Sequence, residues 1–280
     1  MNKKRFTTTH IINPPNVGLI IYKHVRHNKR MNEEINLAGR PYIFRFRQNT
    51  ERTIEEIAEN YIYFPDRESL NDPFDSSPDL VYLTKNPEAT SKLYQLVSEG
   101  ITDKAVKKHF DSKYDLDKLQ EFAHEKVKDF ILEFGVACFS MYYMNLPLWA
   151  NYANDHKGVC LQFDSDIDKD FFSVLGPVSY VEDLTKLEFS PIIEDSDMGK
   201  IFYRKAISWS YEKEVRLVKG FKGKANYNKR ALRNVILGYN SDDAFRDKIV
   251  EAVNKNHEDV GVYKMEKPTK INKFTLTKIK

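Results

Sequence analysis

Short apolar segments with the alternation of β-strands recur from residue 41 to the C-terminus, and they constrain the fold more than any other feature. They outnumber the segments with helical spacing and do not alternate with helices in the regular way of a parallel βαβ sheet. We therefore predict an α+β fold, with a mostly antiparallel sheet, flanking helices and an inserted helical segment. The predicted strands are "PYIFRF", "YIYF", "GVACFSMYY", "KGVCLQFD", "SVLGPVSYV", "WSYEKEVR", "ALRNVILGY", "VGVYKMEK" and "KFTLTKIK".

Apolar residues spaced three and four apart predict the helices. "TERTIEEIAEN" follows the first strand with Thr50 or Thr53 as its N-cap, and "LPLWANYAND" is a short helix or turn. "DMGKIFYRKA" and "DDAFRDKIVEAVNKN" are further predicted helices, and residues 88–133 form the helical insertion. Because "NPPN" interrupts regular structure near the start, we predict an N-terminal extension over residues 1–40 and a single domain over 41–280.

The composition gives few indications of partners. Forty-four Lys and Arg against 41 Asp and Glu leave a formal net charge of +3, which does not favour nucleic acid or a membrane. No segment has the roughly 18 uninterrupted apolar residues of a membrane span. Cys138 and Cys160 lie in apolar runs typical of buried thiols, so we expect a cytoplasmic protein without disulfides. The sequence predicts no particular oligomeric state.

Common catalytic and metal-binding motifs are missing from the sequence. The seven histidines and two cysteines form no CxxC, HExxH or HxxxH pattern, so we predict no metal site. There is no GxxxxGK or GxGxxG phosphate loop and no GxSxG nucleophile motif. The common nucleotide-binding folds and serine hydrolases are therefore not indicated.

Three stretches contain candidate site residues. Arg45 lies inside the aromatic strand "YIFRF", where it either binds a phosphate or carboxylate or faces water on an edge strand. Asn71 and Asp72 in "LNDPFD" are typical of a structural turn. "CFSMYYMNLPLWANYANDHKGVCLQFD" brings Ser140, Trp149 and Tyr152 together, either at a site or, for the last two, on the buried face of a short helix.

The stretch "WSYEKEVR", residues 209–216, places two glutamates two residues apart. If it is a strand, its period of two puts Ser210, Glu212, Glu214 and Arg216 on one face. This is either a salt-bridged structural network or a pair of carboxylates for chemistry, with Arg216 orienting Glu214 or neutralising the pair.

Four spaced motifs resemble the bacterial and phage-associated family of domains of unknown function 2971. They are "PYIFRF", "IYFPDRESLNDPFD", "CFSMYYMNLPLWANYANDHKGVCLQFD" and "WSYEKEVR", in the family's order from about Pro41 onward. At Ile43 the chain departs from many relatives, which have a histidine there. The family name implies no established activity.

The same order of motifs is, more distantly, similar to ADP-ribosyltransferase-type folds. This resemblance implies that Arg45 holds NAD, that Ser140 lies on the central strand, and that Glu214 is the catalytic glutamate with Glu212 accessory. Tyr42 or Trp149 would stack on nicotinamide. The predicted cofactor-binding residues are Tyr42, Arg45, Ser140, Trp149 and Tyr152.

We therefore expect an NAD-consuming, ADP-ribosyltransferase-like enzyme or toxin that acts in conflict between phage and bacterium, with an unknown protein or nucleic-acid acceptor. The first alternative is a non-catalytic nucleotide or nucleic-acid binding or sensor module of a defence system, based on the basic runs "KGFKGKANYNKR" and "KPTKINKFTLTKIK". The second is a metal-dependent nuclease that uses Asp72, Asp75, Glu212 and Glu214.

Overall fold

The structure is a computed structural model that describes residues 42–89, 116–190, 197–267 and 274–280, together with residues 91, 95, 104, 108 and 269. The chain divides into two compact units. The described residues of Ser76–Leu132 and Thr185–Ile201 belong to the smaller unit. The larger unit contains residues 42–75, Glu133–Leu184 and Phe202–Lys280, and the candidate site lies entirely within it.

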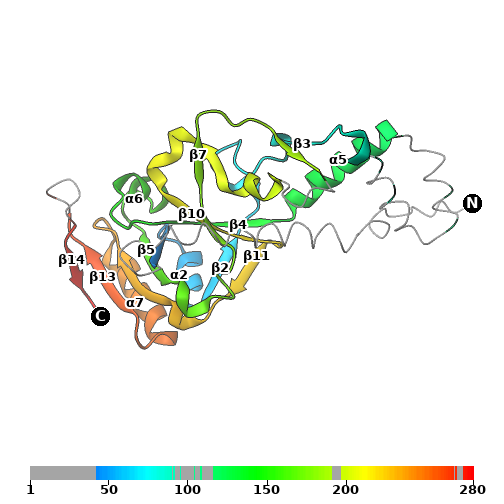
Figure 1. The fold of residues 1–280 in the computed structure, drawn as a ribbon. Helices are drawn as coiled ribbons and strands as arrows, with labels where there is room; N and C mark the ends of the chain where they lie inside the picture. The colour runs from blue at the N-terminus through cyan, green and yellow to red at the C-terminus, as the bar shows by residue number, and fades with distance from the viewer. Residues whose placement is uncertain are drawn as a thin grey trace, which may run out of the picture. The chain divides into compact units, whose positions relative to one another are not determined.

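An eight-stranded sheet forms the centre of the larger unit (Figure 1). Its strand order is β14-β13-β12-β5-β1-β4-β10-β6, and every neighbouring pair is antiparallel except β12 with β13. The predicted α+β fold with a mostly antiparallel sheet is therefore confirmed. The strands are β1 (Tyr42–Arg47), β4 (Gly135–Ser140), β5 (Val159–Asp164), β6 (Leu175–Pro177), β10 (Glu214–Lys219), β12 (Leu232–Leu237), β13 (Gly261–Met265) and β14 (Leu276–Lys278).

Smaller elements surround this sheet in the larger unit. β2 (Tyr61–Phe64) pairs antiparallel with β11 (Gly223–Asn226), and β7 (Ser179–Val181) pairs parallel with β9 (Arg204–Ala206). The helices are α2 (Glu51–Ala58), α6 (Leu146–Tyr152) and α7 (Asp243–Asn256), and 3₁₀ turns cover Arg67–Ser69, Ser165–Asp168, Ile207–Glu212 and Lys229–Ala231.

The smaller unit combines β3 (Val81–Leu83), which pairs parallel with β8 (Leu187–Phe189), and helix α5 (Leu116–Leu132). A 3₁₀ turn at Pro78–Leu80 precedes β3, and another covers Asp197–Tyr203 at the boundary of the units. Helix α5 lies within the predicted helical insertion of residues 88–133. Most of residues 90–115, like the predicted extension over 1–40, lie outside the described residues.

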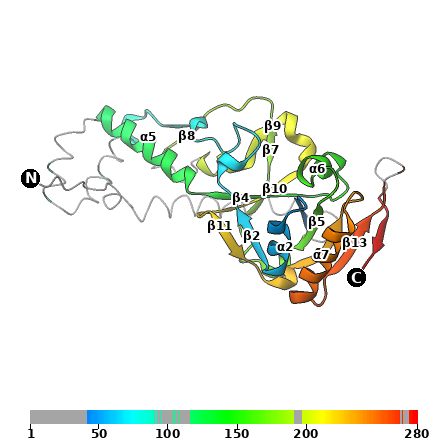
Figure 2. The same cartoon turned by 180° about the vertical axis from the view of Figure 1, so that it is seen from behind.

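Helix α2 begins where the sequence predicts. Thr50 is its N-cap, and the Thr50 hydroxyl accepts a hydrogen bond from the backbone N–H of Thr53 at 3.4 Å. Helices α2 and α7 pack together (Figure 2), and the ring of His257 at the end of α7 bonds to the carbonyl oxygen of Ile57 at 2.8 Å. Helices α2 and α7 are therefore held together by packing and by this hydrogen bond.

Strands β1 and β4 are neighbours in the sheet, but they pair over only one position. β1 pairs with β5 along all of its residues, and β4 pairs with β10 along all of its own. Between β1 and β4, however, the register contains only Phe44 opposite Ser140. The sheet therefore opens at its centre, and this opening positions the candidate site.

Two predicted elements are wrong in type. "WSYEKEVR" is not one strand, because residues 207–212 form a 3₁₀ turn and β10 begins only at Glu214. Between them Lys213 has a left-handed φ of 47°, which interrupts the alternation of side chains. "DMGKIFYRKA" is likewise not an α-helix, since the 3₁₀ turn Asp197–Tyr203 passes directly into β9. In both segments, side chains from elsewhere in the chain bind the backbone, since Ser140 donates to the carbonyl oxygen of Glu212 and Arg216 to that of Phe202.

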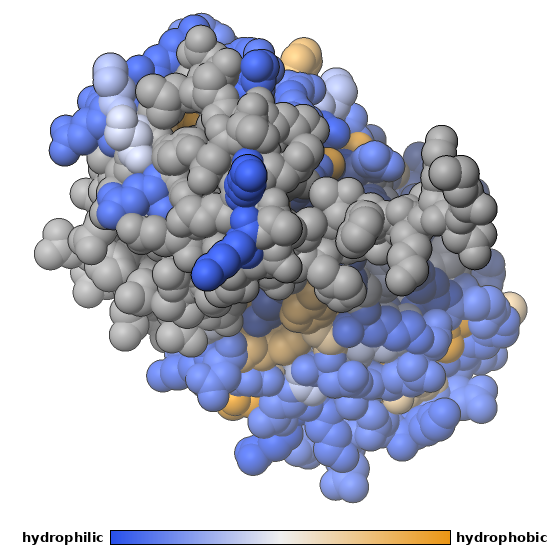
Figure 3. Space-filling view, turned by 90° about the vertical axis from the view of Figure 1, so that its right-hand side faces the viewer, coloured by the Kyte–Doolittle hydropathy of each residue, from blue (hydrophilic) through white to orange (hydrophobic). Residues whose placement is uncertain are grey.

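On the face shown in Figure 3, most of the coloured residues are hydrophilic, and apolar ones form small groups among them. None of the helices in the described part of the chain has the length and apolar character that a membrane crossing requires.

Candidate active site

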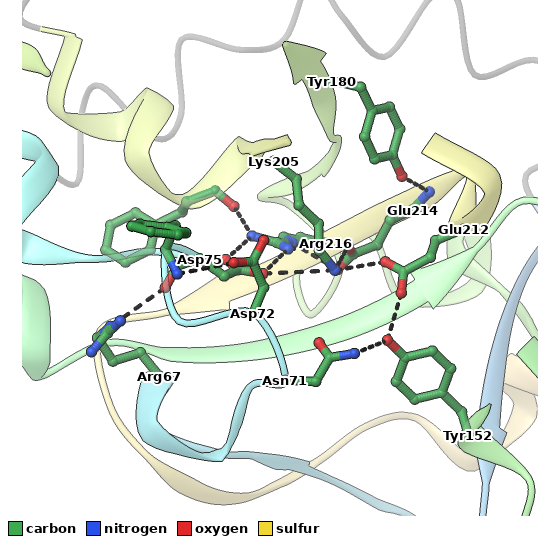
Figure 4. A network of polar contacts seen from close by, with 12 residues as sticks. Arg67, Asn71, Asp72, Asp75, Tyr152, Tyr180, Lys205, Glu212, Glu214 and Arg216 are labelled. Atoms are coloured by element: carbon green, nitrogen blue, oxygen red, sulfur yellow. Dashed lines mark hydrogen bonds and ion pairs between the residues drawn. The ribbon is translucent and has the colours of Figure 1, made fainter. Parts of the chain in front are cut away.

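A buried cluster of five charged side chains lies on one face of the sheet, beside the opening between β1 and β4 (Figure 4). None of the five residues has more than 4% of its surface exposed. Burial of charge is costly unless the charges are paired, so such a cluster requires a specific arrangement of partners. Its members are Asp75, Lys205, Glu212, Glu214 and Arg216.

The strand register puts Glu214 and Arg216 on the same face. In the β10–β4 ladder Glu214 lies opposite Ser140 and Arg216 lies opposite Cys138, and cross-strand partners share a face of a sheet. The intervening Val215 and the following Leu217 are fully buried in the core on the other face. The predicted alternation is therefore correct from Glu214 onward.

Arg216 is the centre of the cluster. Its guanidinium forms two hydrogen bonds to the carboxylate of Asp75, at 2.6 and 2.5 Å, and two to that of Glu214, at 2.7 and 3.0 Å. It also donates to the carbonyl oxygen of Phe202 at 2.9 Å. Burial alone would raise the pKa of Glu214, but Arg216 and then Lys205 outweigh it and lower that pKa to about 2. Glu214 is therefore a fixed carboxylate.

Lys205 connects the three carboxylates. Its ammonium lies 2.6 Å from Oε2 of Glu212, 3.4 Å from Oε2 of Glu214 and 3.9 Å from Oδ2 of Asp75. It also lies 4.6 Å from the centre of the Trp209 ring, in cation–π range. Burial opposes the charged form, but the carboxylates dominate and raise the pKa of Lys205.

Glu212 is bound differently from Glu214. The hydroxyl of Tyr152 donates to its Oε1 at 2.5 Å, and the amide of Asn71 donates to that hydroxyl at 2.7 Å (Figure 4). The carbonyl oxygen of Glu212 accepts from the Ser140 hydroxyl at 2.7 Å, which fixes the 3₁₀ turn over the end of β4. Burial raises the pKa of Glu212 despite the opposing effect of Lys205. The two glutamates are thus separated in pKa by their surroundings.

A cavity of about 220 Å³ opens beside the cluster, between β1 and β4. It is large enough for several ordered waters or part of a small ligand. Phe44, Phe46, Phe139 and Leu148 give it apolar walls, and its polar lining includes Arg45, Arg47, Asn71, Asp75, Ser140, Tyr152, Lys205, Glu212 and Glu214. Of the seven predicted site residues, five therefore line one cavity: Arg45, Ser140, Tyr152, Glu212 and Glu214.

The other two predicted site residues, Tyr42 and Trp149, are not part of the cavity lining. Trp149 is fully buried, packs edge to face on Phe46 and donates its ring N–H to the carbonyl oxygen of Tyr143 at 2.7 Å. This agrees with the alternative of a buried helix face. Tyr42 is half-buried and packs against the hydrophobic cluster that contains Phe44 and Trp149. Helix α6 thus directs Trp149 into the core and Tyr152 toward the cavity.

Arg45 is a buried residue of a central strand, so the edge-strand alternative is wrong. Only 5% of the residue is exposed, its guanidinium donates to the carbonyl oxygen of Tyr63 at 3.0 Å, and it lies 3.8 Å from Glu56. Burial, only partly offset by Glu56, lowers the pKa of Arg45 to about 10. The neighbouring Arg47 pairs with Glu56 at 2.6 Å. Arg45 therefore lies at the cavity, and its buried Nε has no hydrogen-bond partner among the described residues.

The loop before the smaller unit combines structural and site residues. Asp72 accepts a hydrogen bond from the backbone N–H of Phe74 at 2.9 Å, as the predicted structural turn requires. Asn71 instead bonds to Tyr152, and Asp75 to Arg216. Sequence reasoning missed Lys205, because a single lysine in "YRKA" carries no local signal.

The donor set of the site does not favour a metal ion. Among the described residues, no group of three or more His, Cys, Asp or Glu side chains could hold a metal. Asp75 and Glu214, two of the four residues in the nuclease alternative, already bind the guanidinium of Arg216.

Cys138 and Cys160 are free thiols, and burial raises the pKa of each well above its usual value.

Comparison with known proteins found a family resemblance over part of the chain. Residues 148–217 match the model of a family described as "Protein of unknown function (DUF2971)". Comparisons with curated proteins and with solved structures found no significant match. The matched stretch extends from α6 into β10 and contains Tyr152, Lys205, Glu212, Glu214 and Arg216. The resemblance to the DUF2971 family predicted from the sequence motifs is therefore confirmed over residues 148–217.

Proposed function

We propose that the protein cleaves the bond between nicotinamide and ribose in NAD, as an ADP-ribosyltransferase-like enzyme or NAD glycohydrolase. The observation that carries the proposal is a buried carboxyl, Glu212, which faces a cavity whose charged cluster has three carboxylates and only two cations. When all five groups are ionised, one negative charge remains in excess. Arg45 and Arg47 also line the cavity, from β1, so the excess is local to the side where Glu212 lies, and there it favours a cationic group such as the pyridinium ring of NAD.

The proposed reaction needs a negative group beside the reacting sugar. As the glycosidic bond breaks, nicotinamide leaves as a neutral molecule with the bonding electron pair, and positive charge develops on the ribose. A carboxylate about 4 Å away stabilises this charge by roughly 4 kcal/mol at an effective dielectric of about 20. Water or the hydroxyl or amine of an acceptor then attacks the ribose carbon and gives its proton to a base.

The contacts favour different roles for the two glutamates. Both carboxylate oxygens of Glu214 are already bound by Arg216, and Oε2 also faces Lys205, so Glu214 supplies a fixed negative charge. Glu212 has a raised pKa, and an acid or base is most effective when its pKa lies near the working pH. We therefore assign proton removal to Glu212 and electrostatic stabilisation to Glu214.

The cavity walls also fit such a substrate. Apolar faces of Phe44, Phe46 and Phe139 border the polar groups, which suits a flat ring attached to a sugar. Strands β1 and β4 part along this cavity, and their facing edges supply backbone groups for an amide. Arg45 at the same cavity offers a guanidinium for the phosphates.

The test of this proposal is release of nicotinamide from NAD by the purified protein, followed by chromatography with and without cell lysate as a source of acceptor. Glu212→Gln is expected to reduce the rate at least a hundredfold, because it preserves shape and removes the base. Glu182→Gln, an exposed glutamate after β7, is the matched control and should keep the full rate. No release of nicotinamide by the folded wild-type protein under any of these conditions would refute the proposal.

One observation favours a second candidate, a non-catalytic nucleotide-binding or sensor module. The charges of Glu214, Asp75 and Arg216 satisfy one another, which is also the arrangement of a rigid structural network. This candidate predicts that NAD or a related nucleotide binds without being consumed, as measured by calorimetry. The basic run "KGFKGKANYNKR" supports a nucleic-acid ligand less well, since Lys224 pairs with Glu55 and Lys219 binds the carbonyl oxygen of Phe171.

For the enzyme, we also propose a role in conflict between phage and bacterium, with a protein or nucleic acid as the acceptor of ADP-ribose.

A further inference from the structure

The cavity contains a chain of hydrogen bonds that ends on Glu212. The amide of Asn71 donates to the hydroxyl of Tyr152 at 2.7 Å, and that hydroxyl donates to Oε1 of Glu212 at 2.5 Å. A phenol has one proton, so accepting from Asn71 leaves that proton free to point at Glu212. We propose that Asn71 and Tyr152 are positioning residues which hold the carboxyl of Glu212 in its working orientation and determine when it ionises. This inference rests on the proposed function of the same site.

The two residues come from different parts of the chain and are anchored independently. Tyr152 is the last residue of α6, whose preceding turn is fixed in the core by Trp149. Asn71 lies in the loop after the 3₁₀ turn Arg67–Ser69, and Asp75 in the same loop is held by Arg216. Arg67 also binds the carbonyl oxygen of Pro73 at 2.7 Å, which stiffens the loop. The contact between Asn71 and Tyr152 is therefore made by two supported elements.

The other groups around Glu212 act in both directions. Lys205 on β9 binds Oε2 and favours the ionised form, and Glu214 on β10 opposes it. Tyr180 on β7 and Tyr211 in the adjacent turn also interact electrostatically with Glu212. Tyr152 donates to Oε1 of Glu212, whereas Lys205 binds the other oxygen, Oε2. Its hydrogen bond favours the carboxylate over the carboxylic acid, so removing it should make Glu212 ionise at higher pH.

The experiment is a carbon-13 NMR titration of protein labelled at the glutamate side-chain carboxyl, in which the Glu212 signal is identified by its loss in Glu212→Gln. Tyr152→Phe should move the titration midpoint of Glu212 to higher pH, and Asn71→Ala should move it in the same direction by less. Tyr142→Phe, which changes an exposed tyrosine in the loop after β4, should leave the midpoint in place.

An unchanged or lowered midpoint in folded Tyr152→Phe overturns the inference. Asn71→Ala provides the same test through an exposed side chain, should Tyr152→Phe fail to fold. The titration requires no turnover, so it can succeed or fail independently of NAD cleavage. If NAD is cleaved, the acidic limb of the kcat/KM profile should move to higher pH in Tyr152→Phe, and kcat should fall more than KM changes.

Discussion

At the scale of single residues, Arg216 distinguishes the two glutamates to which we assign the proposed reaction. It is fully buried, and its five hydrogen bonds bind Asp75, Glu214 and the carbonyl oxygen of Phe202. Glu214 is thereby held as a carboxylate, while the carboxyl of Glu212 is hydrogen-bonded, among the described residues, to Tyr152 and Lys205. When one partner of a buried ion pair is removed, the remaining charge is left buried and unpaired. The resulting loss of stability exceeds the net stabilisation that the intact pair provides.

Arg216→Met is therefore expected to lower the free energy of unfolding by about 3–5 kcal/mol. Urea unfolding followed by circular dichroism measures this change. Arg230→Met, at an exposed arginine before β12, should change the free energy by less than about 0.5 kcal/mol. A similar small effect for both variants would contradict the central role of Arg216.

The carboxyl of Glu214 predicts an acid-dependent loss of stability. Its pKa falls from 4.5, the ordinary value, to about 2 in the folded protein. The unfolded chain therefore binds this proton at a higher pH than the folded one, so the stabilisation is complete above about pH 4.5 and is lost as the pH falls toward 2. Unfolding free energies measured across this range should converge for the wild type and Glu214→Gln. A constant difference down to pH 2 would show that Glu214 is not held as a carboxylate.

At the scale of elements, the apolar pattern predicted most of the sheet but not the turn that presents Glu212. β1, β4, β5 and β12 lie where alternation and β-branched residues indicate them, because burial in a sheet is a local property of each segment. The turn at 207–212 depends instead on Asn145, which binds the carbonyl oxygen of Tyr211 at 2.6 Å, and on Ser140. These contacts join residues 66 and 72 positions apart. For the same reason the motifs indicated Glu212, Glu214 and Ser140, but not the partnership of Lys205 with them.

Lys213 ends this turn, at the junction with β10. Its φ of 47° lies in the left-handed region, which is unfavourable for a β-branched side chain. Lys213→Val should lower the free energy of unfolding by about 1–2 kcal/mol, whereas Lys213→Gly should change this free energy little. Calorimetric melting of the two variants measures the difference. Equal stability of Val and Gly at this position would contradict the left-handed conformation.

At the scale of the molecule, the opening between β1 and β4 divides the large sheet into two paired groups. β1 continues through β5, β12 and β13 to β14, and β4 continues through β10 to β6. Among the described residues, the strands of these two groups pair at Phe44 with Ser140 alone, and the cavity lies where they part. A ligand in this cavity would contact both groups of strands at once, so its binding would stabilise the association of the two groups.

Bound ligand is therefore expected to slow backbone hydrogen exchange at the facing edges of β1 and β4 together. The measurement compares Glu212→Gln with and without NAD by mass spectrometry, because under the proposed function this variant should bind NAD without consuming it. Peptides from β13 and β14, at the far edge of the sheet, act as the internal reference and should exchange at the same rate in both samples. Protection of only one of the two strands would place the ligand outside the opening. Protection of neither strand at saturating NAD would show that the opening of the sheet is not the nucleotide site.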